Sequence, residues 1–324
     1  MCFGFDGERA LRDSLNQKGA SRRNLLRGAA AGAAGVAAIS TGLAVPAVAH
    51  GGHGGHGGKG KRSVPHHEIS IQLYTLRSAM QDRAGYDLVL DRLAQYGYER
   101  VELAGYGDRT AAELAARLKE VGLRSTSSHE GISASTAAMH TKFQNAVTLG
   151  QKYVVVPYLR EPNTPDQWKA WADQMNAEAA VARKYGLRYG YHNHAHEFVP
   201  FAGSTTTPWE ILTDRLDRRL VHLEVDLFWA YTGGVETGAE DPLAFAIDVV
   251  KDAPQQVRQY HVKDRDESGP EGNKFADLGT GVIDFAKIFR AHGVEEYIVE
   301  NDQPDVTPLT TAAVGHLYLD HLRY

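Results

Sequence analysis

Hydrophobic and polar positions follow two different rhythms from Ile69 to the end of the chain. Short runs of apolar and β-branched residues predict strands, and longer segments with apolar residues at helical spacing predict helices. Segments 111–122 and 165–186 show the helical rhythm, and each ends in a glycine, which commonly stops a helix. The expected strands begin at Ile69, Arg100, Arg124, Tyr153, Arg188, Val221, Arg258 and Tyr297.

This alternation predicts an α/β fold built from parallel βαβ units. Eight such units in about 255 residues match the count and length of a (β/α)8 TIM barrel. An open, doubly wound sheet is the alternative, but it is usually shorter, and no glycine-rich phosphate turn follows the first expected strand. We therefore expect a single TIM-barrel domain over residues 68–324.

The first 49 residues have the pattern of an export signal. Arg22 and Arg23 precede a weakly apolar run over residues 28–45, and residues 47–49 supply the small-residue cleavage pattern. A transmembrane anchor is the alternative, but the run is rich in alanine and glycine and contains polar residues. We expect residues 1–49 to be a twin-arginine (Tat) signal peptide, which makes the Tat machinery a partner. The protein would then be periplasmic or extracellular, with no membrane anchor after cleavage.

Residues 50–67 predict a flexible Gly/His-rich linker, since so dense a run of glycine is costly to order. His50, His53 and His56 can chelate a transition metal weakly, but a solvated spacer is the favoured interpretation. The only cysteine, Cys2, lies in the predicted signal, so we expect no disulfide in the mature chain. The net charge of −5 offers no basic surface for nucleic acid, and we expect no such partner.

Ligand-type side chains recur where the expected strands end. In a barrel, the carboxyl ends of the strands carry the active site. Burying many ionisable groups is costly unless they share a partner, and a divalent cation is a suitable one. The stretch RYGYHNHAHEF, residues 188–198, is therefore predicted to form one wall of a metal site. The strand-end residues are Gln72, Tyr74, Glu102, His129, Glu130, His192, His194, Asp226, His261, Lys263, Glu300 and Asp302.

Five pieces of the second half follow one another in order: GYHNHAHEF, HLEVDLFWA, QYHVKD, LGTGVIDFAKIF and YIVEND. Through them the chain resembles the sugar phosphate isomerase/epimerase family. This is the xylose-isomerase-like TIM barrel group, also called AP endonuclease family 2. The first half matches more loosely, through ISIQLYTLR and YERVELAG. The resemblance implies one divalent metal, held by Glu, Asp, His and Glu from strands five to eight.

Carried over residue by residue, the resemblance implies Asp226, His261 and Glu300 as metal ligands. The strand-five position departs from the family, because His192 stands where many relatives have Glu, and His194 follows two residues later. We predict His192 as the fourth ligand, with Glu197 as the nearest carboxylate able to replace it. Mn or Zn suits such a mixed set best, with Mg or Co as alternatives.

The remaining site predictions concern catalysis and substrate binding. His194 is the expected acid or base, assisted by Glu300 and Lys263. Trp229 is also a candidate for ordinary barrel packing, and the role of Glu224 stays open between support of the metal site and an ion pair. The predicted substrate-binding residues are Glu102, His129, Glu130, Asn193 and Trp229.

These residues together predict an exported, metal-dependent isomerase or epimerase. It would act on a sugar or keto-sugar by removing the proton next to a carbonyl. A lyase or dehydratase, or an enzyme that cleaves keto-glycosides, is an alternative for the same site, and so is a non-catalytic carbohydrate-binding barrel. A DNA-repair endonuclease would need a basic face and a richer set of metal ligands. The sequence shows no run of clustered arginines, which favours an unphosphorylated carbohydrate as the small-molecule substrate.

Overall fold

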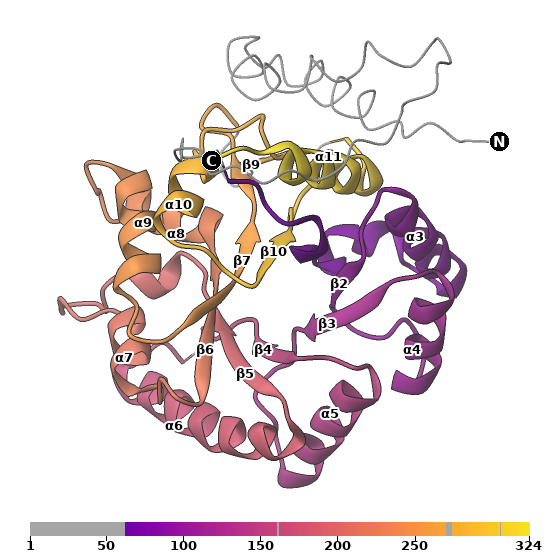
Figure 1. Ribbon diagram of the computed structural model, residues 1–324. Helices are drawn as coiled ribbons and strands as arrows, with labels where there is room; N and C mark the ends of the chain where they lie inside the picture. The colour runs from indigo at the N-terminus through magenta and orange to yellow at the C-terminus, as the bar shows by residue number, and fades with distance from the viewer. Residues whose placement is uncertain (1–61, 161, 270–273, 305) are drawn as a thin grey trace, which may run out of the picture.

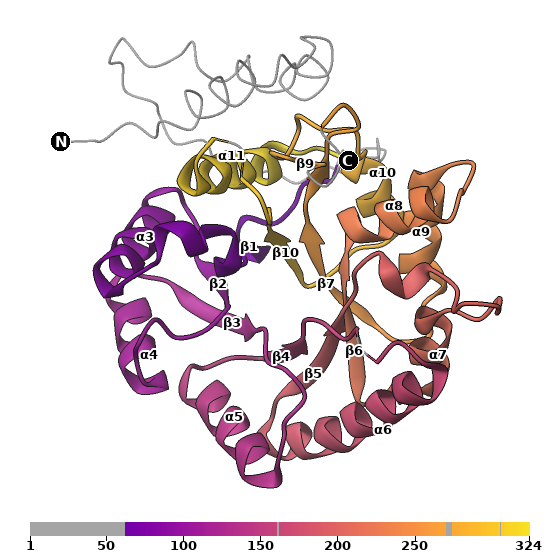
Figure 2. The ribbon, with the colours of Figure 1, turned by 180° about the vertical axis from the view of Figure 1, so that it is seen from behind.

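The computed structural model describes residues 62–160, 162–269, 274–304 and 306–324. The predicted signal peptide and the linker up to residue 61 lie outside these residues. Figure 1 looks along the barrel, whose strands are surrounded by an outer ring of helices, and Figure 2 shows the same arrangement from behind.

The central barrel is closed and its strand pairs are parallel. A six-stranded sheet has the order β1-β10-β7-β6-β5-β4, and β2 pairs with β3. Parallel bridges close the ring, from Gln72 to Glu102 between β1 and β2 and from His129 to Val155 between β3 and β4. The predicted TIM barrel is therefore confirmed. The barrel strands are β1 (Ile69–Ile71), β2 (Arg100–Leu103), β3 (Arg124–Ser128), β4 (Tyr153–Val156), β5 (Arg188–His192), β6 (Val221–Asp226), β7 (Val257–Val262) and β10 (Glu296–Val299).

The helices begin where the sequence supplies caps. The Thr110 and Thr207 side chains cap their helices and form capping boxes with Glu113 and Glu210. Among the described residues, no helix combines the length and apolar character that a membrane crossing requires. The helices are α3 (Arg83–Gln95), α4 (Ala111–Glu120), α5 (Thr136–Thr148), α6 (Pro165–Ala182), α7 (Pro208–Arg215), α8 (Leu227–Glu236), α9 (Pro242–Asp252), α10 (Phe285–Ala291) and α11 (Pro308–His321).

Short elements complete the chain. The helical segment predicted over 165–186 divides into α6 and the 3₁₀ turn η3 (Arg183–Tyr185), which Gly186 ends at a φ of 77°. An antiparallel pair, β8 (Asp264–Arg265) and β9 (Phe275–Ala276), follows β7. The other 3₁₀ turns are η1 (His66–Glu68), η2 (Leu73–Ala79) and η4 (His196–Phe198).

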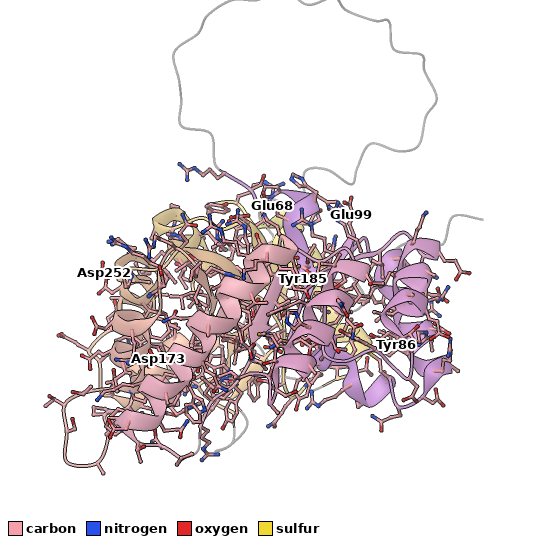
Figure 3. All side chains as sticks on the ribbon, turned by 90° about the horizontal axis from the view of Figure 1, so that it is seen from below. Glu68, Tyr86, Glu99, Asp173, Tyr185 and Asp252 are labelled. Carbon is pink, nitrogen blue, oxygen red and sulfur yellow. The ribbon has the colours of Figure 1, made fainter. Side chains whose placement is uncertain are left out.

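The barrel interior is polar and its outer face is apolar. On β6, Leu223 and Val225 belong to the hydrophobic core, whereas the alternate residues Glu224 and Asp226 are buried and meet polar side chains of other strands. This follows from the two-residue period of a strand. Figure 3 shows the outer layer from the side, where α6, which carries Asp173, crosses the barrel.

The folded domain begins earlier than the sequence suggested. Ser63 forms an antiparallel bridge with Arg323, and Arg62 and Tyr324 exchange backbone hydrogen bonds. Val64 is only 3% exposed. The last part of the predicted linker, residues 62–67, is therefore packed against the C-terminal segment, because one apolar side chain and paired backbone groups hold it there.

Candidate metal centre

Four predicted ligands meet at the carboxyl ends of the barrel strands. His192 ends β5, Asp226 ends β6, His261 lies near the end of β7 and Glu300 directly follows β10. One ligand atom from each lies within 4.8 Å of the others, and all four residues are buried.

The strand register explains this convergence. Asp226 pairs with His261 across β6 and β7, and His192 pairs with Glu224 across β5 and β6. His261 pairs with Ile298, and Glu300 lies two residues further along, on the same face of the chain. Parallel strands of similar length thus present one ligand type after another at the same level of the barrel.

A second group shares two members of the first. His129, which follows β3, and Glu224 of β6 join His192 and His261, again with ligand atoms within 4.8 Å of one another. The Nε2 atom of His129 lies 2.9 Å from Glu224 Oε1, and His261 Nε2 lies 3.0 Å from the same oxygen. Glu224, whose role the sequence left open, therefore faces the interior of the site. The sequence already indicated this orientation, because Glu224 stands two residues before Asp226 in HLEVDLFWA and side chains two apart on a strand face the same way.

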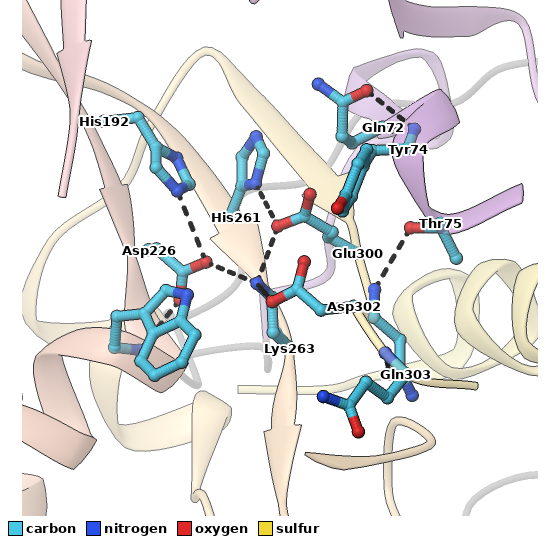
Figure 4. A network of polar contacts seen from close by, with 12 residues as sticks. Gln72, Tyr74, Thr75, His192, Asp226, His261, Lys263, Glu300, Asp302 and Gln303 are labelled. Atoms are coloured by element: carbon cyan, nitrogen blue, oxygen red, sulfur yellow. Dashed lines mark hydrogen bonds and ion pairs between the residues drawn. The ribbon is translucent and has the colours of Figure 1, made fainter. Parts of the chain in front are cut away.

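A lysine is held between carboxylates at the side of the first group (Figure 4). The Lys263 ammonium lies 2.7 Å from Glu300, 2.7 Å from Asp302 and 3.0 Å from Asp226. Burial alone would lower the pKa of Lys263, but these carboxylates raise it well above its ordinary value. Lys263 therefore stays a cation and can donate to a substrate oxygen.

His261 is surrounded by carboxylates on both ring nitrogens. Its Nδ1 lies 2.8 Å from Glu300 Oε2, and its Nε2 lies 2.7 Å from Glu102 Oε2. Burial opposes the imidazolium, yet Glu224, Glu300 and Glu102 together raise the pKa of His261 well above its ordinary value. So concentrated a negative charge stabilises any cation placed among these groups, a proton or a metal ion.

Unpartnered polar atoms test whether the residues fit a metal ion. Among the described residues, Glu102 Oε1, Glu224 Oε2, His194 Nδ1 and Trp229 Nε1 are buried and make no hydrogen bond. Asp226 Oδ2 makes no hydrogen bond either, although it lies 3.0 Å from Lys263 Nζ. Buried polar atoms are almost always satisfied, so this concentration indicates a ligand-binding centre. Imidazole and carboxylate donors together suit Zn, Mn or Co, and the site fits a divalent metal.

His194 lies just beyond β5, at the mouth of the barrel. The centroid of its ring lies 5.1 Å from that of His192 and 5.3 Å from that of Trp229. Burial and the neighbouring His192 hold the pKa of His194 well below its ordinary value. The ring is therefore a neutral imidazole with a free nitrogen near the ligand group, which is the state a general base needs.

The remaining predicted residues lie around this centre in different roles. Glu130 accepts a hydrogen bond from the Tyr106 hydroxyl at 3.2 Å and belongs to neither ligand group. The Asn193 amide is engaged by the backbone of Asp226, whose N–H donates to it at 3.0 Å. Asn193 thus joins the ends of β5 and β6.

Glu197, expected as a substitute ligand, belongs to neither ligand group. Its carboxylate accepts hydrogen bonds from the hydroxyl of Tyr191, on β5, and from the backbone N–H of His194, which lies between β5 and η4. Glu197 therefore fixes the turn that carries His194, since both of its oxygens are already engaged there. No Ser/Thr capping box signals this role in the sequence, because the residue before η4 is Ala195 and no side chain caps the turn.

Comparison with known proteins supplies the family. A family model described as a xylose isomerase-like TIM barrel matches residues 90–293. Curated relatives named inosose dehydratase match part of the chain. One from Clostridium perfringens is 28% identical over 174 residues, which cover 48% of this chain and 54% of the relative. The one from Bacillus licheniformis is 26% identical over 181 residues, covering 48% of this chain and 55% of the relative. The chain thus spans about half the length of the curated relatives it matches.

Solved structures share the fold. A sugar phosphate isomerase/epimerase from Parabacteroides distasonis superposes with a TM-score of 0.63 at 24% identity, covering 80% of this chain and 95% of that one. A probable 3-DHS dehydratase from Bacillus anthracis superposes with a TM-score of 0.57 at 11% identity, covering 77% and 98%. At these identities, the likeness extends to the fold alone.

Proposed function

Because the chain belongs to the xylose isomerase-like TIM barrel family, we propose that it is a metal-dependent enzyme acting on a carbohydrate-like polyhydroxy ketone. Its reaction begins with removal of the proton next to the carbonyl. It continues with loss of the hydroxyl on the following carbon, so that the enzyme is a dehydratase.

The proposal rests chiefly on one observation, the buried convergence of His192, Asp226, His261 and Glu300 beside unpartnered polar atoms. A divalent cation held by these four residues would polarise the substrate carbonyl and make the neighbouring C–H acidic. A structural ion-pair network would leave fewer buried polar atoms without hydrogen bonds.

The chain's own residues supply the proton transfers. His194 Nδ1 takes the proton from carbon, and the electron pair of that C–H bond forms the enolate. The C–O bond of the neighbouring carbon then breaks as the carbon–carbon double bond forms, and the imidazolium returns its proton to the departing hydroxyl, so that water leaves. Lys263 donates a hydrogen bond to substrate oxygen, and the Trp229 N–H orients a hydroxyl.

Elimination is favoured over isomerisation because the curated relatives are named inosose dehydratase. An isomerase or epimerase would share the first step and differ in the last, with a proton returned to carbon and no loss of water. For elimination as for isomerisation or epimerisation, we expect the substrate to carry no phosphate group.

The test is incubation of metal-loaded protein with cyclic polyhydroxy ketones, ketoses and keto-glycosides in deuterated water. A dehydratase produces an unsaturated ketone, which absorbs in the ultraviolet, and loses activity to a chelator. Deuterium incorporated next to the carbonyl without loss of water would establish the isomerase or epimerase instead. Sugar binding without deuterium uptake or stoichiometric metal would overturn catalysis and favour a carbohydrate-binding barrel.

A further inference from the structure

A polar cavity opens at the end of the barrel opposite to the metal centre. It has a volume of about 340 Å³ and is lined by arginines from separate segments, together with the buried His222. This volume lies within the range of small-molecule sites, roughly 300–1,000 Å³. The arginines are Arg183, Arg188, Arg218, Arg219 and Arg258.

The fold gathers these arginines at the amino ends of three neighbouring strands. Arg188 begins β5, Arg258 is the second residue of β7, and Arg218 and Arg219 lie in the turn before β6. Arg183 begins η3. At about 3.3 Å per residue, the length of β6 places the cavity roughly 16 Å from the metal centre. In Figure 3, Glu68, Glu99 and Asp252, which precede β1, β2 and β7, lie on the upper side of the molecule, and this is the end with the arginine cavity.

The positive charge of the cavity is only partly neutralised. Arg219 pairs with Asp217 at 2.9 Å, and Arg258 contacts Glu295. Within the described part of the chain, Arg183, Arg188 and Arg218 form no ion pair. Guanidinium groups held around one cavity repel each other, and an anion placed among them removes this cost.

We propose that this cavity binds a phosphate-bearing ligand. Guanidinium groups match phosphoryl oxygens through paired hydrogen bonds and remain charged at any physiological pH. The three unpaired arginines call for a ligand with two or three negative charges, which a single carboxylate does not supply. The ligand is either a small molecule with a phosphoryl or pyrophosphoryl group or a segment of a polymeric phosphate. The site is separate from the metal centre and does not depend on the reaction proposed there.

The test is calorimetric titration of the full protein with inorganic pyrophosphate at constant ionic strength, up to roughly 10 mM ligand. Arg188→Glu should weaken binding at least tenfold, and Arg188→Ala should weaken it less. Arg290→Glu is the matched control. Like Arg188, Arg290 is exposed and makes no ion pair among the described residues, but it lies on α10, outside the cavity. Circular dichroism checks that each variant is folded.

A second control separates the two ends of the barrel. Asp226→Asn alters the metal centre and should leave pyrophosphate binding unchanged. Loss of binding in Asp226→Asn would place the ligand at the metal centre and so overturn the proposal. Unchanged binding in Arg188→Glu, or no binding by the unaltered protein, would also overturn it. Tighter binding of long-chain polyphosphate than of pyrophosphate would identify a polymer as the ligand, and equal binding a small molecule.

Discussion

The two histidines at the end of β5 differ in their surroundings, although only Asn193 separates them. His192 Nδ1 lies 3.2 Å from Glu224 and its Nε2 3.7 Å from Asp226, so both nitrogens face carboxylates. His194 Nδ1 has no hydrogen-bond partner among the described residues. A ring surrounded by carboxylates suits a metal ligand, and a neutral ring with a free nitrogen suits a base.

These surroundings predict opposite effects of two similar substitutions. His194→Ala should retain the metal and lose about 10²–10⁴ in kcat, because a general base contributes that much. His192→Ala should lose the metal itself. Metal content measured by mass spectrometry, alongside the rate, separates the two. Equal metal content and full activity in both variants would place the chemistry on other residues.

Glu296 provides a pH-dependent contribution to stability at the amino end of the barrel. Burial raises its pKa to about 7 from an ordinary 4.5; Thr126, Arg100 and Ser70 oppose the shift and Glu102 adds to it. Gln259 donates a hydrogen bond to it at 3.3 Å. A raised pKa means that the folded state holds a proton which the unfolded state has released. This contribution is therefore complete below pH 4.5 and is lost as the pH rises through about 7.

Glu296→Gln should remove this dependence, because the amide does not titrate. Between pH 4.5 and 8, the unaltered protein should lose about 3 kcal/mol of unfolding free energy relative to the variant. Urea titrations at several pH values measure the difference, in which the contributions of other groups cancel. Parallel stability curves for the two proteins would show that Glu296 is ionised in the folded state.

At the scale of elements, β5 and β6 approach closely where Gly190 faces His222. A Cβ atom at residue 190 would lie 2.6 Å from His222 Cε1, closer than such atoms pack. Gly190→Ala should therefore destabilise the protein by about 1–3 kcal/mol, because the buried His222 ring has to move. Gly131→Ala is the matched control, since its Cβ would meet nothing within 4 Å and its φ is not positive. Thermal unfolding compares them, and equal melting temperatures would contradict the tight contact.

Most helices and strands could be placed from the sequence because they depend on the pattern of apolar and polar residues within each segment. Apolar alternation located the strands, and the predicted starts at Arg258 and Tyr297 differ by one residue from Val257 and Glu296. The inward face of β6 was likewise readable from its two-residue period. The partners of Glu224 were not, because they come from β5, from β7 and from the residue after β3, and only the closed barrel brings them together.

The arginine cavity marks the limit of local reasoning more clearly. The arginines of the cavity come from three separate stretches of the sequence, around Arg183, Arg218 and Arg258, and they line one cavity because three strands begin at the same end of the barrel. Glu197 shows the converse, since its nearness in sequence to His192 suggested a ligand. The turn after β5 instead directs its carboxylate to Tyr191 and the backbone.

At the scale of the whole molecule, we propose that the barrel is exported by the twin-arginine route. Arg22 and Arg23 are the residues on which this proposal depends, and they lie outside the described residues. Replacing both by Lys should trap the precursor inside the cell, since the Tat machinery reads the arginine pair. Immunoblots of cell fractions measure this, with Arg27→Lys as the matched control. Export of the double variant at the normal level would show that the twin-arginine interpretation is wrong.

The start of the folded domain gives a further prediction about the whole chain. Removal of residues 1–61 should leave the unfolding free energy of the barrel unchanged, because every described contact remains. Removal of residues 1–67 deletes the buried Val64, the Ser63–Arg323 bridge and the backbone hydrogen bonds between Arg62 and Tyr324. Burial of one valine contributes about 1.5–3 kcal/mol, and each backbone hydrogen bond about 1 kcal/mol.

The longer truncation should therefore be less stable than the shorter one by about 3–5 kcal/mol, a difference measurable by urea denaturation. Val64→Ala in the protein that lacks only residues 1–61 is the control that separates side-chain burial from backbone pairing, and it should account for about half of the loss. The C-terminal segment adds a local readout, because Tyr324 packs against Phe289 with ring centroids 5.6 Å apart. Its amide protons should exchange faster with solvent in the longer truncation alone. Equal stability and equal exchange in both truncations would mean that residues 62–67 do not hold the C-terminus in solution.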